Sequence, residues 1–279
     1  MISSLDVTAG GHRLRVHTTG RPDAPAIVWL HGSGPGADGL TNWEGVLPRF
    51  AGSHYSLAPD LLGFGDSDHP DPAPHGMAAF TEARARSVIA LLDELGVSRA
   101  HFVGNSMGGM ITLTVASLAP ERVGRMVLMG SGGAPNSPSP DLMKLITFYA
   151  DPTPAAMEDL LSSMVHDDGL FAGRLGEIAA ARLARAVRPE VRRSHLATFA
   201  PGMPPVSFTP EQLAALPHET LVVHGREDRM LPFSGGLYLA ENLPNARLHL
   251  LPHAGHWVQI EQADAFAALA ALFLTEGDR

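Results

Sequence analysis

Ser106 stands in the segment Gly104-Asn105-Ser106-Met107-Gly108, which matches the pattern G-x-S-x-G. An apolar run precedes this segment and a helical pattern follows it, so we expect the serine on a sharp turn between a strand and a helix. Such a turn needs small residues beside a strained nucleophile, and the helix N-terminus directs free N–H groups at the serine oxygen. Ser106 is therefore the candidate nucleophile of an acyl-transfer reaction. The alternative is a glycine-rich turn that only caps a helix.

A second glycine-rich segment, His31-Gly32-Ser33-Gly34-Pro35-Gly36, follows another apolar run. The surroundings of Ser106 point to the α/β-hydrolase fold. In that fold this loop gives one backbone N–H to the oxyanion hole, and the residue after the nucleophile gives the other. We therefore expect the donors at Ser33, or its neighbour, and at Met107. The alternative is a phosphate-binding loop, but the segment lacks the Lys-Ser/Thr ending of a P-loop and the spacing of a dinucleotide fingerprint.

The same fold places an acidic residue after the nucleophile in the chain and a histidine last. Asp228 lies in HGREDR (residues 224–229), directly behind an apolar run, and it is the candidate acid. Its task would be to fix the tautomer of the histidine and to stabilise the imidazolium. Glu227, one position earlier, is the competing candidate.

Three histidines follow the acid: His249, His253 and His256. His249 lies within the last expected strand, His253 at the end of that strand, and His256 in the loop beyond. A histidine in a loop can lean over the edge of the sheet toward Ser106, whereas a histidine in the strand cannot. We therefore predict that His256 is the general base.

Short apolar runs that alternate with helical patterns have to position these residues. The runs cover residues 14–18, 26–30, 55–58, 100–103, 125–129, 220–223 and 247–251. Continuous apolar runs are typical of a parallel sheet that is buried on both faces. Helical spacing marks residues 80–95, 107–119 and 264–274. The alternation predicts an α/β class fold, with a doubly wound and mostly parallel sheet.

The stretch from about residue 134 to residue 217 breaks this alternation. Pro and Ser are frequent at its start, a Met-, Leu- and Ala-rich helical pattern follows, and no strand pattern is convincing. We interpret it as a helical lid inserted between two core strands. The expected organisation is a first core part (1–133), the lid (134–217) and a second core part (218–279).

The composition limits the partners of the chain. A net charge of −9 without a Lys/Arg run argues against nucleic-acid binding. The absence of cysteine excludes disulfides, thiolate metal sites and a cysteine nucleophile. The N-terminus lacks a signal-peptide pattern, and the longest apolar stretch, residues 265–274, is too short to span a bilayer. We therefore expect a cytoplasmic protein without membrane association.

Five segments together resemble the meta-cleavage product hydrolases, which cleave carbon–carbon bonds in aromatic and steroid ring degradation. The segments are LHGSGPGADGLTNW (30–43), PDLLGFGDSD (59–68), GNSMGG (104–109), HGREDRMLP (224–232) and AGHWVQIE (254–261). The resemblance covers nearly the whole chain. It implies the α/β-hydrolase fold with an inserted helical lid, and a small anionic substrate of the 2-hydroxy-6-oxohexa-2,4-dienoate type.

The resemblance also implies which residues bind the substrate. Arg182 matches the lid arginine that grips the carboxylate of the dienoate, a task that suits a planar guanidinium. Arg174 and Arg185 are the competing alignments, and a solvated helix arginine is the alternative interpretation.

Polar and aromatic residues complete the implied substrate site. Asn42 and Asn105 match polar groups around the 2-hydroxy/oxo end of the substrate. Trp257 matches a ring that lines the site, although it could also serve packing. The glycine-rich loop would contribute Gly32 and Gly34.

The reaction that the resemblance implies has two stages. The site first ketonises the dienol by placing a proton on C5. Ser106, activated by His256, then attacks the C6 ketone while the oxyanion hole holds the developing charge. Cleavage releases 2-hydroxypenta-2,4-dienoate, and water activated by His256 frees the acid from the acyl-enzyme. No metal and no organic cofactor is needed.

Other proteins share parts of this pattern. Haloalkane dehalogenases and epoxide hydrolases use Asp in place of Ser106. A carboxylesterase needs the same triad and is the main alternative, followed by a perhydrolase- or lactonase-like enzyme and by a non-catalytic receptor. An esterase has no need for Arg182 together with Asn42 and Asn105.

The chain departs from the family pattern at two places. Leu40 stands where the family often carries Trp, and the lid stretch Gly169-Leu170-Phe171 matches poorly. Since the lid selects the C6 substituent, the sequence leaves that substituent open. A dimer-based homo-oligomer is the expectation for the family.

Overall fold

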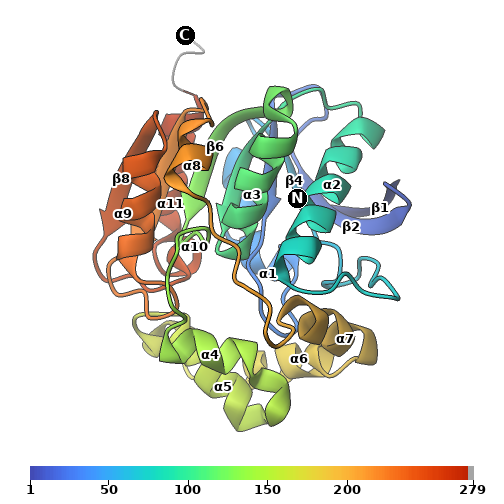
Figure 1. Ribbon diagram of the computed structural model, residues 1–279, viewed down its shortest axis with the longest axis vertical. Coiled ribbons are helices and arrows are strands. Elements are labelled where there is room, and N and C mark those ends of the chain that lie inside the picture. The colour runs from blue at the N-terminus through green and yellow to red at the C-terminus, as the bar shows by residue number, and fades with distance from the viewer. Residues whose placement is uncertain (276–279) are drawn as a thin grey trace.

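A computed structural model describes residues 1–275 of the chain. Its centre is an eight-stranded sheet with the order β1-β2-β4-β3-β5-β6-β7-β8 (Figure 1). The strands are β1 (Ser3–Ala9), β2 (His12–Thr19), β3 (Ala26–Leu30), β4 (Tyr55–Pro59), β5 (Ala100–Asn105), β6 (Val123–Met129), β7 (Thr220–Gly225) and β8 (Ala246–Leu251). Pairing is antiparallel from β1 to β4 and parallel from β4 to β8. The predicted mostly parallel sheet is confirmed.

The apolar-run criterion misses β1. From Ser4 to Ala9, exposed side chains alternate with half-buried or buried ones, because the strand lies at the edge of the sheet. A two-residue turn, Gly10-Gly11, joins β1 to β2, with Ala9 paired to His12. Both glycines have a positive φ, 58° and 82°. Such glycine pairs are typical of tight β-hairpins, so the turn was the available signal for this strand.

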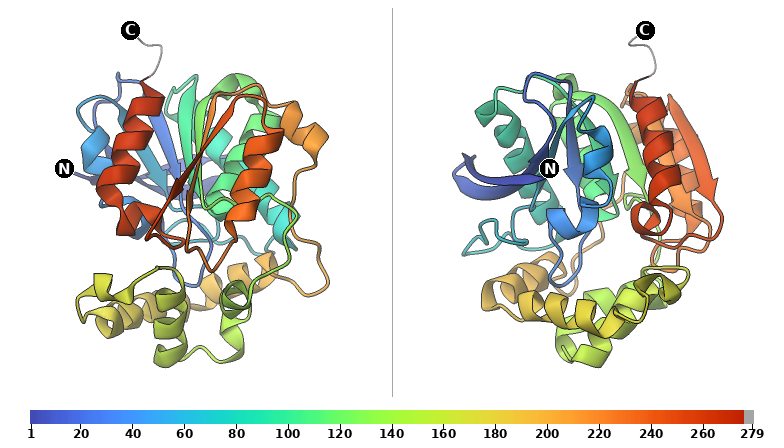
Figure 2. Two further views of the ribbon diagram at one scale, coloured as in Figure 1. Left: turned by 90° about the vertical axis from the view of Figure 1, so that its left-hand side faces the viewer. Right: turned by 180° about the vertical axis from the view of Figure 1, so that it is seen from behind.

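Helices cover both faces of the sheet (Figure 2). On one face lie α2 (Met77–Glu94), α3 (Met107–Leu118) and α9 (Phe233–Asn242), and on the other lie α1 (Gly39–Trp43), α10 (Val258–Glu261) and α11 (Ala263–Leu274). Side chains along a strand alternate between the faces. Val28 therefore enters the first core and Trp29 the second. No helix within residues 1–275 is long and apolar enough to cross a membrane.

Helices inserted between β6 and β7 form a separate layer, drawn below the sheet in Figure 1. They are α4 (Pro140–Ile146), α5 (Pro154–Ser163), α6 (Leu175–Ala186) and α7 (Pro189–Thr198). Ser139-Pro140 and Thr153-Pro154 begin two of them, and each hydroxyl accepts a hydrogen bond from the backbone of the first turn. An apolar core that includes Phe148 and Leu160 holds the layer together.

The end of the inserted segment returns to the main sheet. Gly133 and Ser207 form an isolated parallel β-bridge. Phe208, and Leu213 of α8 (Pro210–Ala214), are buried in the same core as α2, α3 and α9. Within residues 134–217, the separate helical layer therefore ends at Thr198. An irregular segment, the strap (201–205), follows, and α8 then packs in the main core.

Candidate active site

Ser106 occupies the turn between β5 and α3 with φ 55° and ψ −114°. This conformation is rare for a residue with a side chain and stores strain in the turn. The flanking glycines have a steric cause. A Cβ on Gly104 would come within 2.5 Å of the Gly108 backbone, and a Cβ on Gly108 would overlap the Leu30 carbonyl oxygen. The Ser106 N–H donates to the Met129 carbonyl oxygen at 3.0 Å, which ties the turn to β6.

Asp228 and His256 form a buried pair behind the carboxyl ends of the strands. His256 Nδ1 lies 2.8 Å from Asp228 Oδ2. Asp228 Oδ1 accepts hydrogen bonds from the N–H groups of Met230 and Leu231. Burial alone would raise the pKa of Asp228, but His256 and His224 outweigh that effect and hold the pKa below its ordinary value. The ionised carboxylate accepts the proton on Nδ1, which leaves Nε2 of His256 available as a base.

Gly130, directly after β6, connects this pair to the nucleophile. A Cβ on Gly130 would lie 3.2 Å from His256 Nδ1 and 3.4 Å from Asp228 Oδ2. The preceding residue, Met129, accepts the hydrogen bond of the Ser106 backbone. Among residues 1–275 no hydrogen bond joins the Ser106 hydroxyl to His256, and in unliganded sites such bonds are often long and tighten when substrate binds. The structure thus brings the three residues to one edge of the sheet.

The competing acid and bases lie away from this pair. Glu227 accepts hydrogen bonds from Arg226 and from the Ala254 N–H rather than from a histidine. His249 is exposed on β8, and His253 is exposed in the turn that follows. The geometry therefore favours the buried Asp–His pair as acid and base.

The loop that carries His256 is hydrogen-bonded to the lid. The sequence did not predict this attachment. The N–H groups of residues 256 and 257 both donate to the carbonyl oxygen of Met164, at the end of α5. The Glu261 carboxylate accepts hydrogen bonds from the Gly255 N–H and the His166 N–H, each at 2.6 Å. The position of the histidine therefore depends on the position of the lid.

The glycine-rich loop after β3 lies against the nucleophile. A Cβ on Gly32 would come within 3.1 Å of the Ser106 Cβ. The buried imidazole of His31 holds the loop, because Nδ1 donates to the Gly32 carbonyl oxygen at 2.8 Å and Nε2 accepts from the Leu61 N–H at 3.0 Å. Burial lowers the pKa of His31, which suits a neutral ring that donates at one nitrogen and accepts at the other.

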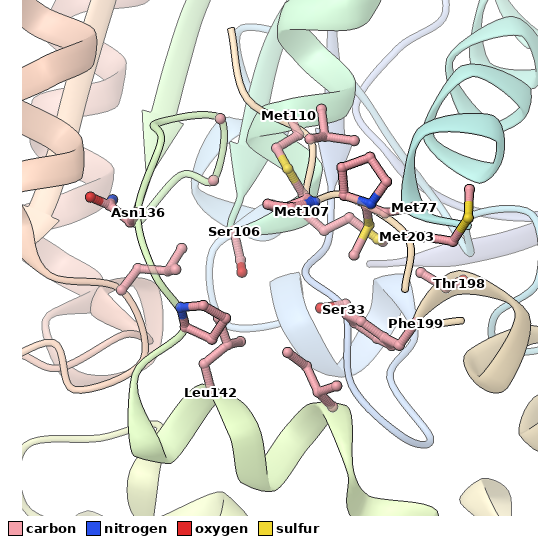
Figure 3. A pocket seen from close by; sticks show the side chains of 18 of the residues that line it. Ser33, Met77, Ser106, Met107, Met110, Asn136, Leu142, Thr198, Phe199 and Met203 are labelled. Carbon is pink, nitrogen blue, oxygen red and sulfur yellow. The ribbon is translucent and has the colours of Figure 1, made fainter. Parts of the chain in front are cut away.

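Ser33 and Met107 line a cavity together with Ser106 (Figure 3). Neither backbone N–H has a hydrogen-bond acceptor among residues 1–275. Unpaired donors beside a nucleophile are what an oxyanion hole requires. The geometry therefore supports these two positions as its donors.

Arg182 of α6 is a buried arginine on the side of the lid that faces the loop after β3. Its Nε donates to the Pro35 carbonyl oxygen at 3.0 Å, and its guanidinium carbon lies 5.5 Å from the centre of the Trp257 ring. Within the described chain its two terminal nitrogens form no hydrogen bond and no ion pair. Burial lowers the pKa of Arg182 to about 10, so the group stays charged at neutral pH. Asp38 is near enough to favour the charged form but forms its ion pair with Arg185. A buried cation whose terminal nitrogens have no partner in the described chain points to an anionic ligand.

The two competing arginines are engaged elsewhere. Arg174 is exposed and pairs with Glu177. Arg185 pairs with Asp38 at 3.4 Å and donates to the Gly36 carbonyl oxygen. Of these three lid arginines, Arg182 is the one whose terminal nitrogens have no partner among residues 1–275.

Two asparagines also present polar atoms without a partner in the described chain. These atoms are Nδ2 of Asn42 and Oδ1 of Asn105, and both are buried. A Cβ on Gly32 would lie 3.0 Å from Asn105 Oδ1, and a Cβ on Gly34 would lie 2.9 Å from a terminal nitrogen of Arg182. An unpaired buried polar atom is costly unless a ligand completes its hydrogen bonds. The loop glycines thus leave room beside the groups that would bind a polar ligand.

The site has a polar part and an apolar part. A cavity of about 340 Å³ opens at Ser106 between the sheet and the lid, and Trp257, Arg182 and the two asparagines do not line it. The loop Gly32–Gly34 lies between the parts, since Ser33 lines the cavity, while a Cβ on either neighbouring glycine would come within 3.0 Å of a polar group. A ligand that spans both parts would place its middle at the nucleophile.

Comparisons with known proteins agree with this geometry. Residues 25–263 match the family described as alpha/beta hydrolase fold. The chain is 38% identical to a 2-hydroxymuconate semialdehyde hydrolase of Pseudomonas sp. (strain CF600), over 98% of this chain and 94% of the relative. A 2-hydroxy-6-oxo-6-phenylhexa-2,4-dienoate hydrolase from Rhodococcus sp. strain RHA1 superposes with a TM-score of 0.94 at 38% identity, covering 98% and 99% of the two chains. A serine hydrolase from the polyaromatic-hydrocarbon-degrading bacterium Cycloclasticus zankles gives a TM-score of 0.96 at 36% identity over both whole chains. The resemblance inferred from the sequence motifs is confirmed.

Proposed function

The chain belongs to the alpha/beta hydrolase fold family, and we propose that it hydrolyses the C5–C6 carbon–carbon bond of a 2-hydroxy-6-oxohexa-2,4-dienoate formed by ring cleavage in aromatic or steroid degradation. The observation that carries the proposal is Arg182. It is a buried arginine whose terminal nitrogens have no partner in the described chain. They lie beside the glycine-rich loop that follows β3 and packs against the nucleophile. An ester hydrolase has no use for such a group, whereas a dienoate carries a carboxylate at the required end.

The substrate would lie across both parts of the site. Its carboxylate pairs with the Arg182 guanidinium, which can donate two parallel hydrogen bonds. Its 2-oxygen meets the unpaired polar atoms of Asn42 and Asn105. This placement brings C6 to Ser106 and directs the C6 substituent into the cavity.

Ketonisation makes the carbon–carbon bond breakable. The proton of the 2-hydroxyl leaves and a proton is added at C5, which gives a 2,6-dioxo compound with a C3–C4 double bond. When C5–C6 later breaks, the electron pair left on C5 is delocalised through that double bond to the C2 carbonyl. The leaving group is therefore a stabilised carbanion.

The Ser106 hydroxyl then adds to C6 while Nε2 of His256 takes its proton. The C6 oxygen becomes an oxyanion that accepts hydrogen bonds from the N–H groups of Ser33 and Met107. Collapse of this intermediate breaks C5–C6, and protonation yields 2-hydroxypenta-2,4-dienoate. Water, deprotonated by His256, hydrolyses the acyl-serine and releases the carboxylic acid.

The variant Arg182→Ala tests the proposal. Charge-assisted hydrogen bonds contribute about 1.5–3 kcal/mol each. Losing two of them should lower kcat/KM for a dienoate by at least about 100-fold. Bleaching of the yellow dienoate measures this loss, and a p-nitrophenyl ester, which has no carboxylate to bind, should lose less than about fivefold.

The control is Arg174→Ala, which removes an exposed lid arginine and should leave both activities unchanged. Equal losses on dienoate and ester in Arg182→Ala would contradict the carboxylate role. Ester turnover without bleaching of any dienoate would replace the proposal by a carboxylesterase.

We also propose, from the resemblance, that the protein acts in the cytoplasm as a dimer-based homo-oligomer. Cell fractionation tests the location. Light scattering on the eluting peak of a sizing column tests the assembly, and a mass equal to the 29.5 kDa of one chain would contradict it.

A further inference from the structure

The cavity at Ser106 is the part of the site that has to hold the C6 substituent. If the carboxylate at C1 lies at Arg182 and C6 lies at Ser106, everything beyond C6 extends away from the arginine. The cavity is lined by Ser106 and by both positions of the oxyanion hole, but not by Arg182 (Figure 3). Its size and lining therefore bear on which substituent the protein accepts.

The cavity is large for a small substituent. Its volume is about 340 Å³, whereas a cavity of about 150 Å³ accommodates benzene. There is thus room for about two aromatic rings. A hydrogen or a methyl group would leave most of the apolar wall without contact, and each buried CH₂-sized group is worth about fourfold in affinity.

The wall of the cavity is mainly apolar and adaptable. Leu142 and Ile146 of α4 form one side, and Phe199 after α7 forms another. Met77 and Met110 lie on the side of the sheet (Figure 3). Unbranched methionine side chains adjust to ligands of different shape and contact aromatic rings favourably. None of the described residues that line the cavity is charged, so a carboxylate on the substituent would be desolvated without a counterion.

One end of the cavity is closed by a strap rather than by a packed helix. The strap is Pro201-Gly202-Met203-Pro204-Pro205, and its methionine is 43% exposed. A Cβ on Gly76, just before α2, would come within 2.8 Å of the Met203 methyl group. The flexible Met203 side chain thus lies between the strap and the start of α2, where a change of its rotamer would alter the length of the cavity.

We infer that the preferred substrates carry a large, uncharged, fused-ring aryl group at C6, and that small alkyl and carboxylated C6 substituents are used poorly. The inference rests on the proposed carbon–carbon hydrolysis and defines its substrate class. Three observations support it: the volume of the cavity, the absence of charge among the lining residues described, and the methionine at the strap.

Four dienoates that differ only at C6 test the inference: methyl, phenyl, naphthyl and 2-carboxyethyl. The naphthyl compound should exceed the methyl compound in kcat/KM at least tenfold, because several ring carbons are buried. The carboxyethyl compound should be the poorest substrate. Ile146→Trp, which fills the cavity, should lower kcat/KM for the naphthyl compound at least tenfold and change that for the methyl compound less than threefold.

Met143→Trp is the matched control, since Met143 lies on the same helix, is 40% exposed and does not line the cavity. It should change neither value. If Ile146→Trp does not fold, Met203→Arg at an exposed position tests the same point and should raise use of the carboxyethyl compound while lowering use of the naphthyl compound.

The outcomes separate the inference from the proposed function. Bleaching of the methyl compound at least as fast as the naphthyl compound would overturn the inference and leave the carbon–carbon hydrolysis standing. Equal losses for both compounds in Ile146→Trp would do the same. Failure to bleach any of the four dienoates would overturn the proposed function itself.

Discussion

Replacing Asp228 by Asn should abolish most of the activity while leaving the fold intact. The carboxylate Oδ2 lies 2.8 Å from His256 Nδ1, and Oδ1 accepts two backbone hydrogen bonds. An amide oxygen at the Oδ1 position can keep those two bonds. The amide nitrogen then faces His256 Nδ1 as a donor and forces that nitrogen to become an acceptor.

The size of the effect follows from this change of tautomer. With Nδ1 as acceptor, the proton of the neutral ring moves to Nε2, which can no longer take the proton of Ser106. The ring also loses the charge-assisted bond that stabilises its protonated form, worth about 1.5–3 kcal/mol. In a serine protease used as reference, the corresponding change lowers kcat about 10⁴-fold, which equals about 5.5 kcal/mol. We expect a loss of 10³- to 10⁴-fold here, because the His256 and Asp228 side chains are buried, with exposed fractions of 4% and 0%.

Single-turnover bleaching of a dienoate measures this loss, with circular dichroism and the urea midpoint as checks of the fold. Glu227→Gln is the matched control, since this neighbouring side chain binds Arg226 and not the histidine. It should keep activity within twofold. A loss below tenfold in Asp228→Asn, or an equal loss in Glu227→Gln, would refute the assignment of the acid.

Two further predictions concern stability. Burial lowers the pKa of His195 to about 4, below the unfolded value of about 6.5, so between these values the unfolded state binds more protons and stability falls as the pH falls. Between pH 7 and pH 4 the free energy of unfolding, measured in urea, should therefore fall by about 3 kcal/mol less in His195→Phe than in the wild type. An equal fall in both proteins would contradict this prediction. Gly108→Ala should lower the free energy of unfolding by more than about 4 kcal/mol, because its Cβ would overlap the Leu30 carbonyl oxygen. Gly45→Ala is the control. No atom lies within 4 Å of its added Cβ, so its Tm should shift by only a few degrees. A wild-type Tm for Gly108→Ala would show that the turn can relax.

The sheet was predictable because most of its strands are buried on both faces. β3 and β4 are buried at every position, so each reads as a continuous apolar run. β1 does not form such a run, because one of its faces is exposed to solvent. The return of α8 to the main core was not predictable, since Leu213 is apolar and would suit the core of the lid equally well.

The candidate site was predictable where local signals mark it. Glycines or a loop stand beside Ser106, Asp228 and His256, each after an apolar run. Arg182 is different, because its burial and its bond to Pro35 depend on residues about 150 positions away. Arg84 is a second residue whose role depends on distant partners.

The guanidinium of Arg84 is fully buried and bonds Leu62, Thr198 and the sulfur of Met107. In the sequence this residue looks like an ordinary solvated helix arginine. Its partners come from the loop after β4, from the end of α7 and from the nucleophile turn. Only the tertiary structure therefore shows that Arg84 supports Met107, the residue expected to complete the oxyanion hole.

Product analysis in ¹⁸O-labelled water tests the central claim most directly. Incubation with a 6-aryl-2-hydroxy-6-oxohexa-2,4-dienoate should yield equal amounts of 2-hydroxypenta-2,4-dienoate and the aryl carboxylic acid. One ¹⁸O atom should enter the acid and none the dienoate, and Ser106→Ala should form neither product. Hydrolysis of p-nitrophenyl esters by the same preparation, with the dienoate recovered unchanged, would contradict the account.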